Sequence, residues 1–151
     1  MAAINGLKKM GKIVSLNISK SKGISKEAVD QVTVRLNHGI EGDAHAADWH
    51  RQISLLAQES IDKMIAMGLD LAPGAFAENV TTEGIELTAL PIGARLVCGE
   101  VELEITQIGK KCHSKCNIFQ QVGDCIMPKE GVFAKVIKPG ILHKGAALSP
   151  V

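Results

Sequence analysis

Residues 94–108 read ARLVCGEVELEITQI and carry the clearest structural signal in this chain. From residue 101 onward, apolar and polar side chains alternate, which is the period of a strand with one buried face. The pair Gly99-Glu100 separates this run from the apolar run at 94–98, and a two-residue connection containing glycine is typical of a tight hairpin. We therefore expect two antiparallel strands, at 94–98 and 101–108.

Working outward from this hairpin, the chain predicts more short strands than helices. Further strands are expected at residues 11–18, 31–36, 53–56, 131–137 and 141–142. One helix is expected at 58–67, because apolar residues recur there at helical spacing and Gly68 suits the position after a last turn. Residues 81–84 are expected to form a turn. The pattern indicates a mainly β fold, a barrel or sandwich with a few short helices (a β-rich α+β class), and the length predicts a single domain over residues 1–151.

The charge balance excludes some classes of partner. The 151 residues hold 17 Lys and Arg against 16 Asp and Glu, a net charge of +1, whereas a protein that neutralises many phosphates needs a basic excess. Aromatic side chains make up 3% of the chain, which leaves little for stacking bases. The chain has neither a membrane-spanning apolar run nor the apolar core of a signal peptide. We therefore expect a cytoplasmic protein that binds neither nucleic acid nor membrane.

The four cysteines divide into one isolated residue and one cluster. Cys98 lies in an apolar run, where a free thiol usually behaves as a small buried hydrophobe. The cluster comprises Cys112, Cys116 and Cys125. Nearby positive charge makes a thiol more reactive, and this cluster is flanked by Lys110, Lys111 and Lys115. Three interpretations stay open: a reactive thiol, unpaired structural thiols, or a soft metal site built from Cys112, His113, Cys116 and Cys125.

A second group of chemically active side chains lies in a glycine-containing loop. Within fourteen positions the sequence places His38, Asp43, His45, Asp48, His50 and Arg51. Close-set His and Asp side chains can hold a metal or an oxyanion, and the planar guanidinium of Arg51 suits a phosphate or a carboxylate. The alternative is a solvated loop without a special role. Asn79 stands just before the predicted turn, where Asn commonly bonds its own backbone. His143 is expected to be structural or on the surface.

Several of these segments occur together in one order along the chain. They are GDAH at 42–45, HRQISLL at 50–56, FAENVTTEGI at 76–85, LPIG at 90–93, the cysteine cluster, and GVFAKV at 131–136. As a set they resemble the MOSC domain, the C-terminal domain of molybdenum cofactor sulfurase, in its small stand-alone bacterial form. The most specific piece is ENVTTEG at 78–84 combined with the downstream cysteines. The resemblance covers residues 11–148 and implies a β-barrel-like domain with a few helices.

The resemblance also implies a chemistry, which is the carriage of sulfur or the binding of the molybdenum cofactor. The family's marked cysteine is matched best by Cys116 and next by Cys112, so these are the expected catalytic thiols. The expected metal ligands are Cys116 and Cys125. The expected contacts to the cofactor are Arg51, His45, Asn79, Lys110 and Lys111.

Partners follow from what the chain lacks relative to the full sulfurase. The sulfurase half that binds pyridoxal phosphate has no counterpart here, so that cofactor would belong to a partner such as a cysteine desulfurase. A molybdoenzyme or a cofactor-biosynthesis protein would be the other expected partner.

Three functions are consistent with the sequence. The first is a sulfur carrier or cofactor-binding domain in which Cys116 accepts sulfur as a persulfide or ligates molybdenum. The second is a passive module that holds molybdopterin through Asn79, Arg51 and His45. The third is a structural metal site on Cys112, Cys116 and Cys125. Whether the chain turns over a substrate by itself stays open at this point.

Overall fold

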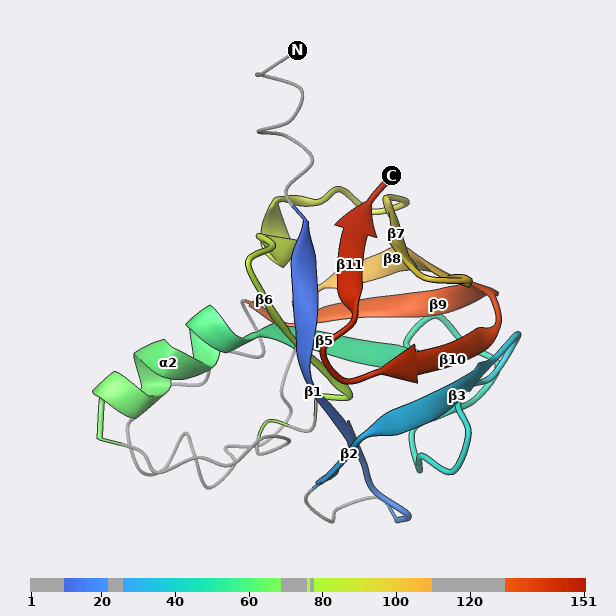
Figure 1. Ribbon diagram of the computed structural model, residues 1–151, viewed down its shortest axis with the longest axis horizontal. Coiled ribbons are helices and arrows are strands. Elements are labelled where there is room, and N and C mark those ends of the chain that lie inside the picture. Colours follow the sequence, from blue (N-terminus) through green and yellow to red (C-terminus); the bar gives the residue numbers. More distant parts are fainter. Residues whose placement is uncertain (1–9, 22–25, 69–75, 77, 110–129) are drawn as a thin grey trace.

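The computed structural model describes residues 10–21, 26–68, 76, 78–109 and 130–151. Seven strands of this part form a closed barrel (Figure 1). Around the barrel the order is β11 (Ala147–Pro150), β7 (Arg95–Cys98), β8 (Val101–Ile108), β9 (Val132–Lys138), β5 (Ile53–Ala57), β6 (Val80–Glu83) and β1 (Gly11–Ile18). Pairing of β1 with β11 closes the ring. The fold is therefore mainly β, as the sequence predicts.

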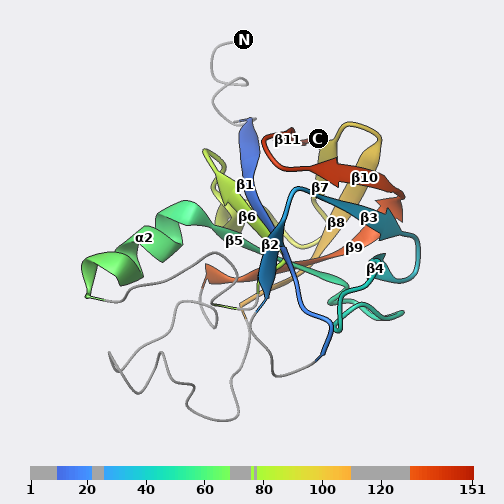
Figure 2. The ribbon, with the colours of Figure 1, turned by 60° about the horizontal axis from the view of Figure 1, so that its bottom comes forward.

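Smaller elements surround the barrel. A three-stranded sheet has the order β10 (Gly140–His143), β3 (Gln31–Arg35) and β4 (Gly39–Ile40), and β2 (Glu27–Val29) pairs with one end of β1. The helix α2 (Gln58–Ala66) lies outside the barrel between β5 and β6 (Figures 1 and 2). These two strands are parallel, and a parallel pair needs a crossover connection of this kind. A short 3-10 helix, η1 (Leu87–Ala89), follows β6.

The core is built by the alternation that the sequence shows. In the β7–β8 hairpin, Leu96 lies opposite Leu103 and Cys98 lies opposite Val101, and all four side chains are buried. Inward-facing residues of the other barrel strands and of the small sheet join them in one apolar cluster. Closing the ring also removes unpaired strand edges, which would otherwise invite association.

The outer face of two barrel strands is covered as well, and this layer positions the candidate site. Ser54 of β5 lies opposite Phe133 of β9, and both side chains are buried although neither belongs to the apolar core cluster. Arg51, from the loop at 41–52 between β4 and β5, lies over the Phe133 ring, and Asn79, just before β6, hydrogen-bonds the Ser54 hydroxyl. A polar layer of this kind on the outside of a barrel can hold chemically active side chains in fixed positions.

The predicted boundaries agree closely with the observed ones. The strands predicted at 11–18 and 101–108 match β1 and β8 residue for residue. The other predicted strands and the helix differ from the observed elements by one residue at one or both ends. Gly68 follows the helix with φ +102°, a conformation that glycine adopts without steric cost.

The turn predicted at 81–84 is wrong. Thr81 and Thr82 lie within β6, where they pair with β5 on one side and β1 on the other. Both threonines are fully buried, and β-branched residues fit a pleated, buried surface. Only Gly84, with φ +82°, forms the turn itself.

Three short strands, β2, β4 and β11, were not expected from the sequence. Each has four residues or fewer, and too few residues alternate in them for a period to be recognised. The sequence assigns Gly39 and Ile40 to a polar loop, whereas they pair with β3 as β4.

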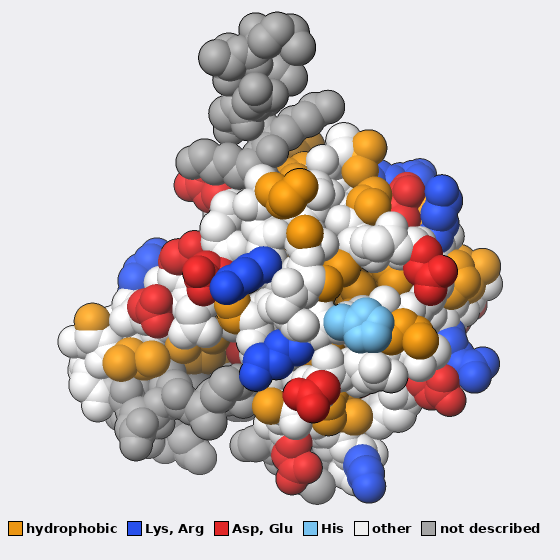
Figure 3. Space-filling view, viewed as in Figure 1, with side chains coloured by type: hydrophobic (Ala, Val, Ile, Leu, Met, Phe, Trp, Pro, Cys, Tyr) orange, Lys and Arg blue, Asp and Glu red, His pale blue; other side chains and the backbone are white. Residues whose placement is uncertain are grey.

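The surface agrees with the charge balance of the sequence. On the face shown in Figure 3, basic and acidic side chains of the described residues are interspersed, and neither kind gathers in a patch. Within the described part of the chain, no helix is long and apolar enough to cross a membrane.

Candidate functional site

The loop at 41–52 brings Arg51 onto the outer face of β9. The Arg51 guanidinium lies 4.5 Å from the ring centroid of Trp49 and 5.6 Å from that of Phe133. Contact with two aromatic rings stabilises a cation and restricts its rotation. We call Trp49, Arg51 and Phe133 the Arg51 surface.

The hydrogen-bonding capacity of Arg51 is not used up within the described structure. Its Nε atom is buried and has no hydrogen-bond partner there. No carboxylate of the described residues forms an ion pair with its guanidinium. A buried donor on a permanent cation is costly to leave unpaired, and an anionic ligand is the group that would pair with it.

A β-bulge secures the loop next to Arg51. The register between β8 and β9 shifts at Thr106, and the Thr106 hydroxyl lies within hydrogen-bonding distance of the carbonyl oxygens of His50 and Phe133. Gln107 follows, and its Oε1 lies 2.9 Å from Nε2 of His50. Bulges often redirect side chains beside functional sites. Here the bulge fixes the residue that precedes Arg51.

The segment that contains the cysteine cluster connects the end of β8 to the start of β9. Gly109 N donates to Gly131 O at 2.6 Å, and Gln107 Nε2 donates to Gly109 O at 2.8 Å. The chain therefore leaves β8 and re-enters β9 at one place, and that place is linked through Gln107 to His50, the neighbour of Arg51.

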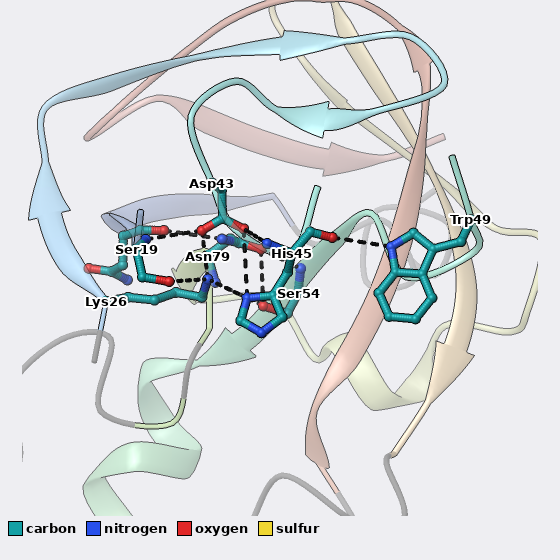
Figure 4. Close-up of polar contacts among 8 residues, drawn as sticks. Ser19, Lys26, Asp43, His45, Trp49, Ser54 and Asn79 are labelled. Carbon is teal, nitrogen blue, oxygen red and sulfur yellow. Dashed lines mark hydrogen bonds and ion pairs between the residues drawn. The ribbon is translucent and has the colours of Figure 1, made fainter. Parts of the chain in front are cut away.

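A buried ion pair supports the other end of the loop. Lys26 Nζ donates to Asp43 Oδ1 at 2.6 Å and lies 3.1 Å from Nδ1 of His45 (Figure 4). The backbone N–H groups of Ser19 and His45 also donate to the Asp43 carboxylate, at 3.1 and 3.2 Å. The carbonyl oxygen of His45 accepts a hydrogen bond from Trp49 Nε1. This hydrogen bond connects the Lys26–Asp43–His45 cluster to the Arg51 surface.

The environment of Asp43 favours its charged form. Burial by itself raises the pKa of Asp43, but hydrogen bonds from Lys26 and Ser19, the charge of Lys26 and a contact with Asn79 together hold that pKa below its ordinary value of 3.8. Asp43 is therefore a carboxylate at neutral pH, and it forms an ion pair with Lys26.

Asn79 joins three segments below this cluster. Its Oδ1 accepts from the backbone N–H of Ser54 at 3.0 Å and from the Ser54 hydroxyl at 3.2 Å, and its Nδ2 donates to Asn17 O at 3.2 Å. The side chain is 1% exposed. Asn79 thus connects β1, β5 and the start of β6. Its side chain also hydrogen-bonds the Asp43 carboxylate.

Three of the residues predicted from the sequence lie in the described part of the chain. His45 and Asn79 both approach the Asp43 carboxylate, whereas Arg51 contacts Trp49 and Phe133 and is linked to His45 through the hydrogen bond from Trp49 to the His45 carbonyl oxygen. The other five predicted site residues lie outside the described residues: Cys112, Cys116, Cys125, Lys110 and Lys111. The flanking His113 and Lys115 lie outside them too.

The remaining candidates take ordinary positions. Cys98 is buried in β7, and burial raises the pKa of its thiol, as expected for a structural cysteine. His38 is half-buried, whereas Asp48 and His143 are exposed. Within the described ranges, no group of three or more His, Cys, Asp or Glu side chains is placed to hold a metal ion. His38, His45 and His50 therefore do not form the metal site that their spacing allowed.

Four residues of the site were not singled out from the sequence: Lys26, Trp49, Gln107 and Phe133. A signal existed for Trp49, because it is the one tryptophan of the chain and stands two residues before Arg51. The sequence around Lys26 and Gln107 gave no such signal, because each contacts residues that are distant in sequence and become neighbours only in the folded chain.

An open cavity adjoins the Arg51 surface. Its volume is about 390 Å³, and Trp49, His50, Gln52 and Lys135 contribute to its wall. Lys135 and Asp48 place one basic and one acidic side chain on this wall. The hollow is large enough for a small organic molecule, since ligand pockets commonly measure about 300–1,000 Å³.

Comparison with known proteins agrees with this architecture. The structure is similar to the YuaD protein from Bacillus subtilis, with a TM-score of 0.79 at 19% identity over 95% of this chain and 96% of that one. It is also similar to YiiM from Geobacillus stearothermophilus, with a TM-score of 0.67 at 23% identity over 93% and 75% of the two chains. YiiM from Escherichia coli gives a TM-score of 0.61 at 23% identity over 95% and 69%. At these identities the similarity shows a shared fold.

The family follows from the sequence itself. No curated protein sequence matches the chain significantly. The family model of the MOSC domain, however, matches residues 41–149, which include the loop with Arg51, the strands β5 to β9 and the cysteine cluster. The chain therefore belongs to the MOSC domain family, whose members resemble the C-terminal domain of molybdenum cofactor sulfurase.

Proposed function

We propose that this protein carries sulfur, or holds the molybdenum cofactor, at a site formed by the Arg51 surface and the cysteine cluster. One observation carries the proposal: a guanidinium is held between two aromatic rings with a buried, unpartnered Nε, beside the point where the cysteine-bearing segment joins the barrel. Family membership supports the same chemistry in general terms.

The residues present fit an anionic cofactor. Molybdopterin carries a phosphate, and Arg51 offers a planar, fixed set of donors that includes the orphaned Nε. His45 would supply a further contact, and Asn79 would act by holding Asp43 and β5 in place. Lys110 and Lys111 would add positive charge. When bound, the cofactor would supply a molybdenum centre, with Cys116 and Cys125 as the proposed protein ligands.

The thiol step needs no oxidant. A partner desulfurase, which would hold the pyridoxal phosphate, presents a persulfide; the Cys116 thiolate attacks its outer sulfur, and the partner's thiolate leaves. The new persulfide then sits on Cys116, with Cys112 as the second thiol. The positive charge of Lys110, Lys111 and Lys115 would favour the attacking thiolate. A molybdoenzyme or a cofactor-biosynthesis protein would receive the sulfur.

Mass spectrometry tests the thiol step directly. Protein purified without oxygen is treated with a cysteine desulfurase and L-cysteine, and its denatured mass is measured before and after reductant. We expect a gain of one sulfur atom that reductant removes, and its loss in Cys116→Ala. Cys98→Ala is the matched control, because Cys98 is buried in the barrel, and it should load like the wild type. Full loading of Cys116→Ala would refute the assignment to Cys116.

Anion binding is tested through the single tryptophan. Trp49 stacks on Arg51, so an oxyanion bound there should change its fluorescence. We expect Arg51→Ala to weaken tungstate and phosphate binding by about tenfold to a hundredfold. Arg35→Ala is the control, because Arg35 is exposed and pairs with Glu41 on the surface. Equal affinities in both variants would contradict the anion site.

A passive molybdopterin-binding module is the second candidate, since the Arg51 surface alone could serve it. The two functions separate in Arg51→Ala. Loss of cofactor binding with unchanged persulfide loading would favour the passive module, and loss of both would favour one shared site. A structural metal on Cys112, Cys116 and Cys125 is tested by a chelator, which would lower the melting temperature.

A further inference from the structure

The open cavity that adjoins the Arg51 surface has a buried amide in its wall. This cavity lies between the β3–β4 turn and β9, and Gln52, which is 3% exposed, belongs to its lining. The Oε1 atom of Gln52 accepts a hydrogen bond from the backbone N–H of Val136 at 2.9 Å. Because a backbone N–H can only donate, the amide oxygen must be the atom beside β9, and the NH2 group must occupy the other arm of the planar amide.

The NH2 group of Gln52 is open to the cavity. Among the described residues, the bond to Val136 is the one hydrogen bond that this side chain makes. Two buried side-chain polar atoms of the described residues lack a partner, and they are Arg51 Nε and Thr82 Oγ1. Nε2 of Gln52 is not one of them, so this unpartnered atom reaches accessible space, and the space that Gln52 lines is the cavity. A fixed pair of neutral N–H donors is thus available to a ligand there.

The charges on the cavity wall do not favour an ion. Asp48 and Lys135 contribute one acidic and one basic side chain. Lys135 Nζ also lies 3.7 Å from Glu104 Oε2, so a carboxylate of the protein already faces this ammonium. An anion would gain little from these charges, and burying it costs more than burying a neutral molecule. A neutral acceptor can pair with the Gln52 donors without that cost.

The rest of the wall offers apolar surface. Trp49 and Leu36 are 37% and 51% exposed, and both line the cavity. Small-molecule pockets typically combine apolar and aromatic walls with a few placed polar groups, and an indole presents a flat face to a flat ligand. Trp49 also contacts Arg51, which is not among the described residues that line the cavity. The cavity therefore adjoins the Arg51 surface without including its guanidinium.

We propose that this cavity is a second ligand site, which binds a small, neutral, flat molecule through a carbonyl oxygen that accepts a hydrogen bond from Nε2 of Gln52. The flat part of the molecule packs against Trp49 and Leu36. The site is separate from the anion site of the proposed function and does not depend on it.

Benzamide is a suitable probe, because it is neutral and flat and carries one carbonyl group. In a proton–nitrogen NMR spectrum of the isotope-labelled wild-type protein, the Gln52 NH2 signals are identified by their loss in Gln52→Glu. We expect benzamide to shift these signals and the indole N–H signal of Trp49 along one saturable curve, with a Kd of about 1 mM. Gln52 signals that do not move at well above this concentration would overturn the proposal and leave the cavity to water.

Two related molecules test the chemistry of the ligand. Toluene keeps the ring but has no acceptor, and benzoate keeps the shape but carries a charge. We expect each of them to bind about tenfold more weakly than benzamide. Equal binding of toluene would show that the Gln52 donors play no part, and equal binding of benzoate would show that the cavity does not select a neutral molecule. Either result would overturn the proposal.

Gln52→Glu tests the donor itself, because it keeps an oxygen for the Val136 N–H and removes the NH2 group. We expect benzamide to bind about tenfold more weakly to this variant. Gln58→Glu makes the same substitution on the exposed surface of α2 and should bind like the wild type. Unchanged affinity in Gln52→Glu would overturn the proposal. If this variant fails to fold, through-bond assignment of the wild type identifies the Gln52 signals, and the wild-type titration decides.

Tungstate distinguishes this cavity from the anion site. Saturating tungstate should leave the affinity for benzamide unchanged. Competition between the two would indicate one shared site and would overturn the proposal of a second one. If tungstate does not bind at all, the anion site fails, whereas the benzamide titration is judged separately.

Discussion

Lys26 and Asp43 form an ion pair that is almost completely withdrawn from solvent, with Nζ 2.6 Å from Oδ1. The pair ties the chain just before β2 to the loop that carries Arg51. Burying two charges costs much of what their attraction returns, but removing one partner leaves an uncompensated charge in the interior. The pair therefore contributes more to the geometry of the site than to net stability.

Loss of the Asp43 charge should destabilise the protein strongly. We expect Asp43→Asn to lower the free energy of unfolding by about 3 kcal/mol, because Lys26 stays buried without a counter-charge. Urea denaturation measures the change. The matched control is Glu41→Gln, which removes one partner of the exposed pair with Arg35 and should cost less than about 1 kcal/mol. Similar small losses in both variants would show that the buried pair is not important for stability.

Asp43 should also make stability depend on pH in acid. Its folded pKa lies below the ordinary value of 3.8, because hydrogen bonds and the charge of Lys26 outweigh the effect of burial. The stabilisation is fully present above the unfolded pKa and is lost as the pH falls through the lower folded pKa. The difference in unfolding free energy between wild type and Asp43→Asn should therefore narrow below about pH 4. A difference that stays constant down to about pH 2 would contradict this assignment.

The buried hydrogen bonds of Asn79 should contribute strongly to the stability of the protein. Asn79→Ala leaves the backbone N–H of Ser54 and the carbonyl oxygen of Asn17 without their side-chain partner in a buried region. We expect a loss of about 3 kcal/mol in the free energy of unfolding, measured by thermal or urea denaturation. Gln58→Ala removes an amide that bonds Asp62 on the exposed helix surface, and it should cost only about 0.5 kcal/mol. Equal costs would argue against the connecting role of Asn79.

Phe133 should matter for anion binding more than for stability. Phe133→Leu keeps an apolar side chain over β9 but removes the ring under the Arg51 guanidinium. A cation–π contact is worth about 0.5–2 kcal/mol, so we expect tungstate binding to weaken about threefold to tenfold through poorer positioning of Arg51. The melting temperature should fall by only a few degrees, about what a loss of roughly 1 kcal/mol causes. Unchanged affinity would show that Trp49 alone positions the guanidinium.

Several features of this molecule can be predicted from short stretches of its sequence. The hairpin at 94–108, the strand at 11–18 and the helix ended by Gly68 were expected close to their observed positions. Each depends on a side-chain period or a glycine within a few residues. The turn predicted at 81–84 fails for the opposite reason, since two neighbouring strands hold Thr81 and Thr82 in β6.

The site divides in the same way. Local composition is sufficient to single out Arg51, His45 and Asn79 as candidates, because their chemistry is visible residue by residue. Their arrangement depends on contacts between distant parts of the chain: Thr106 meets His50 across 56 positions, and Asn79 meets Asn17 across 62. These contacts depend on the order of the strands in the closed barrel. The alternation of apolar and polar residues shows which face of a strand is buried, but not which strand lies beside it. For the same reason, the contact between Lys26 and His45 depends on the tertiary structure and cannot be predicted from the sequence.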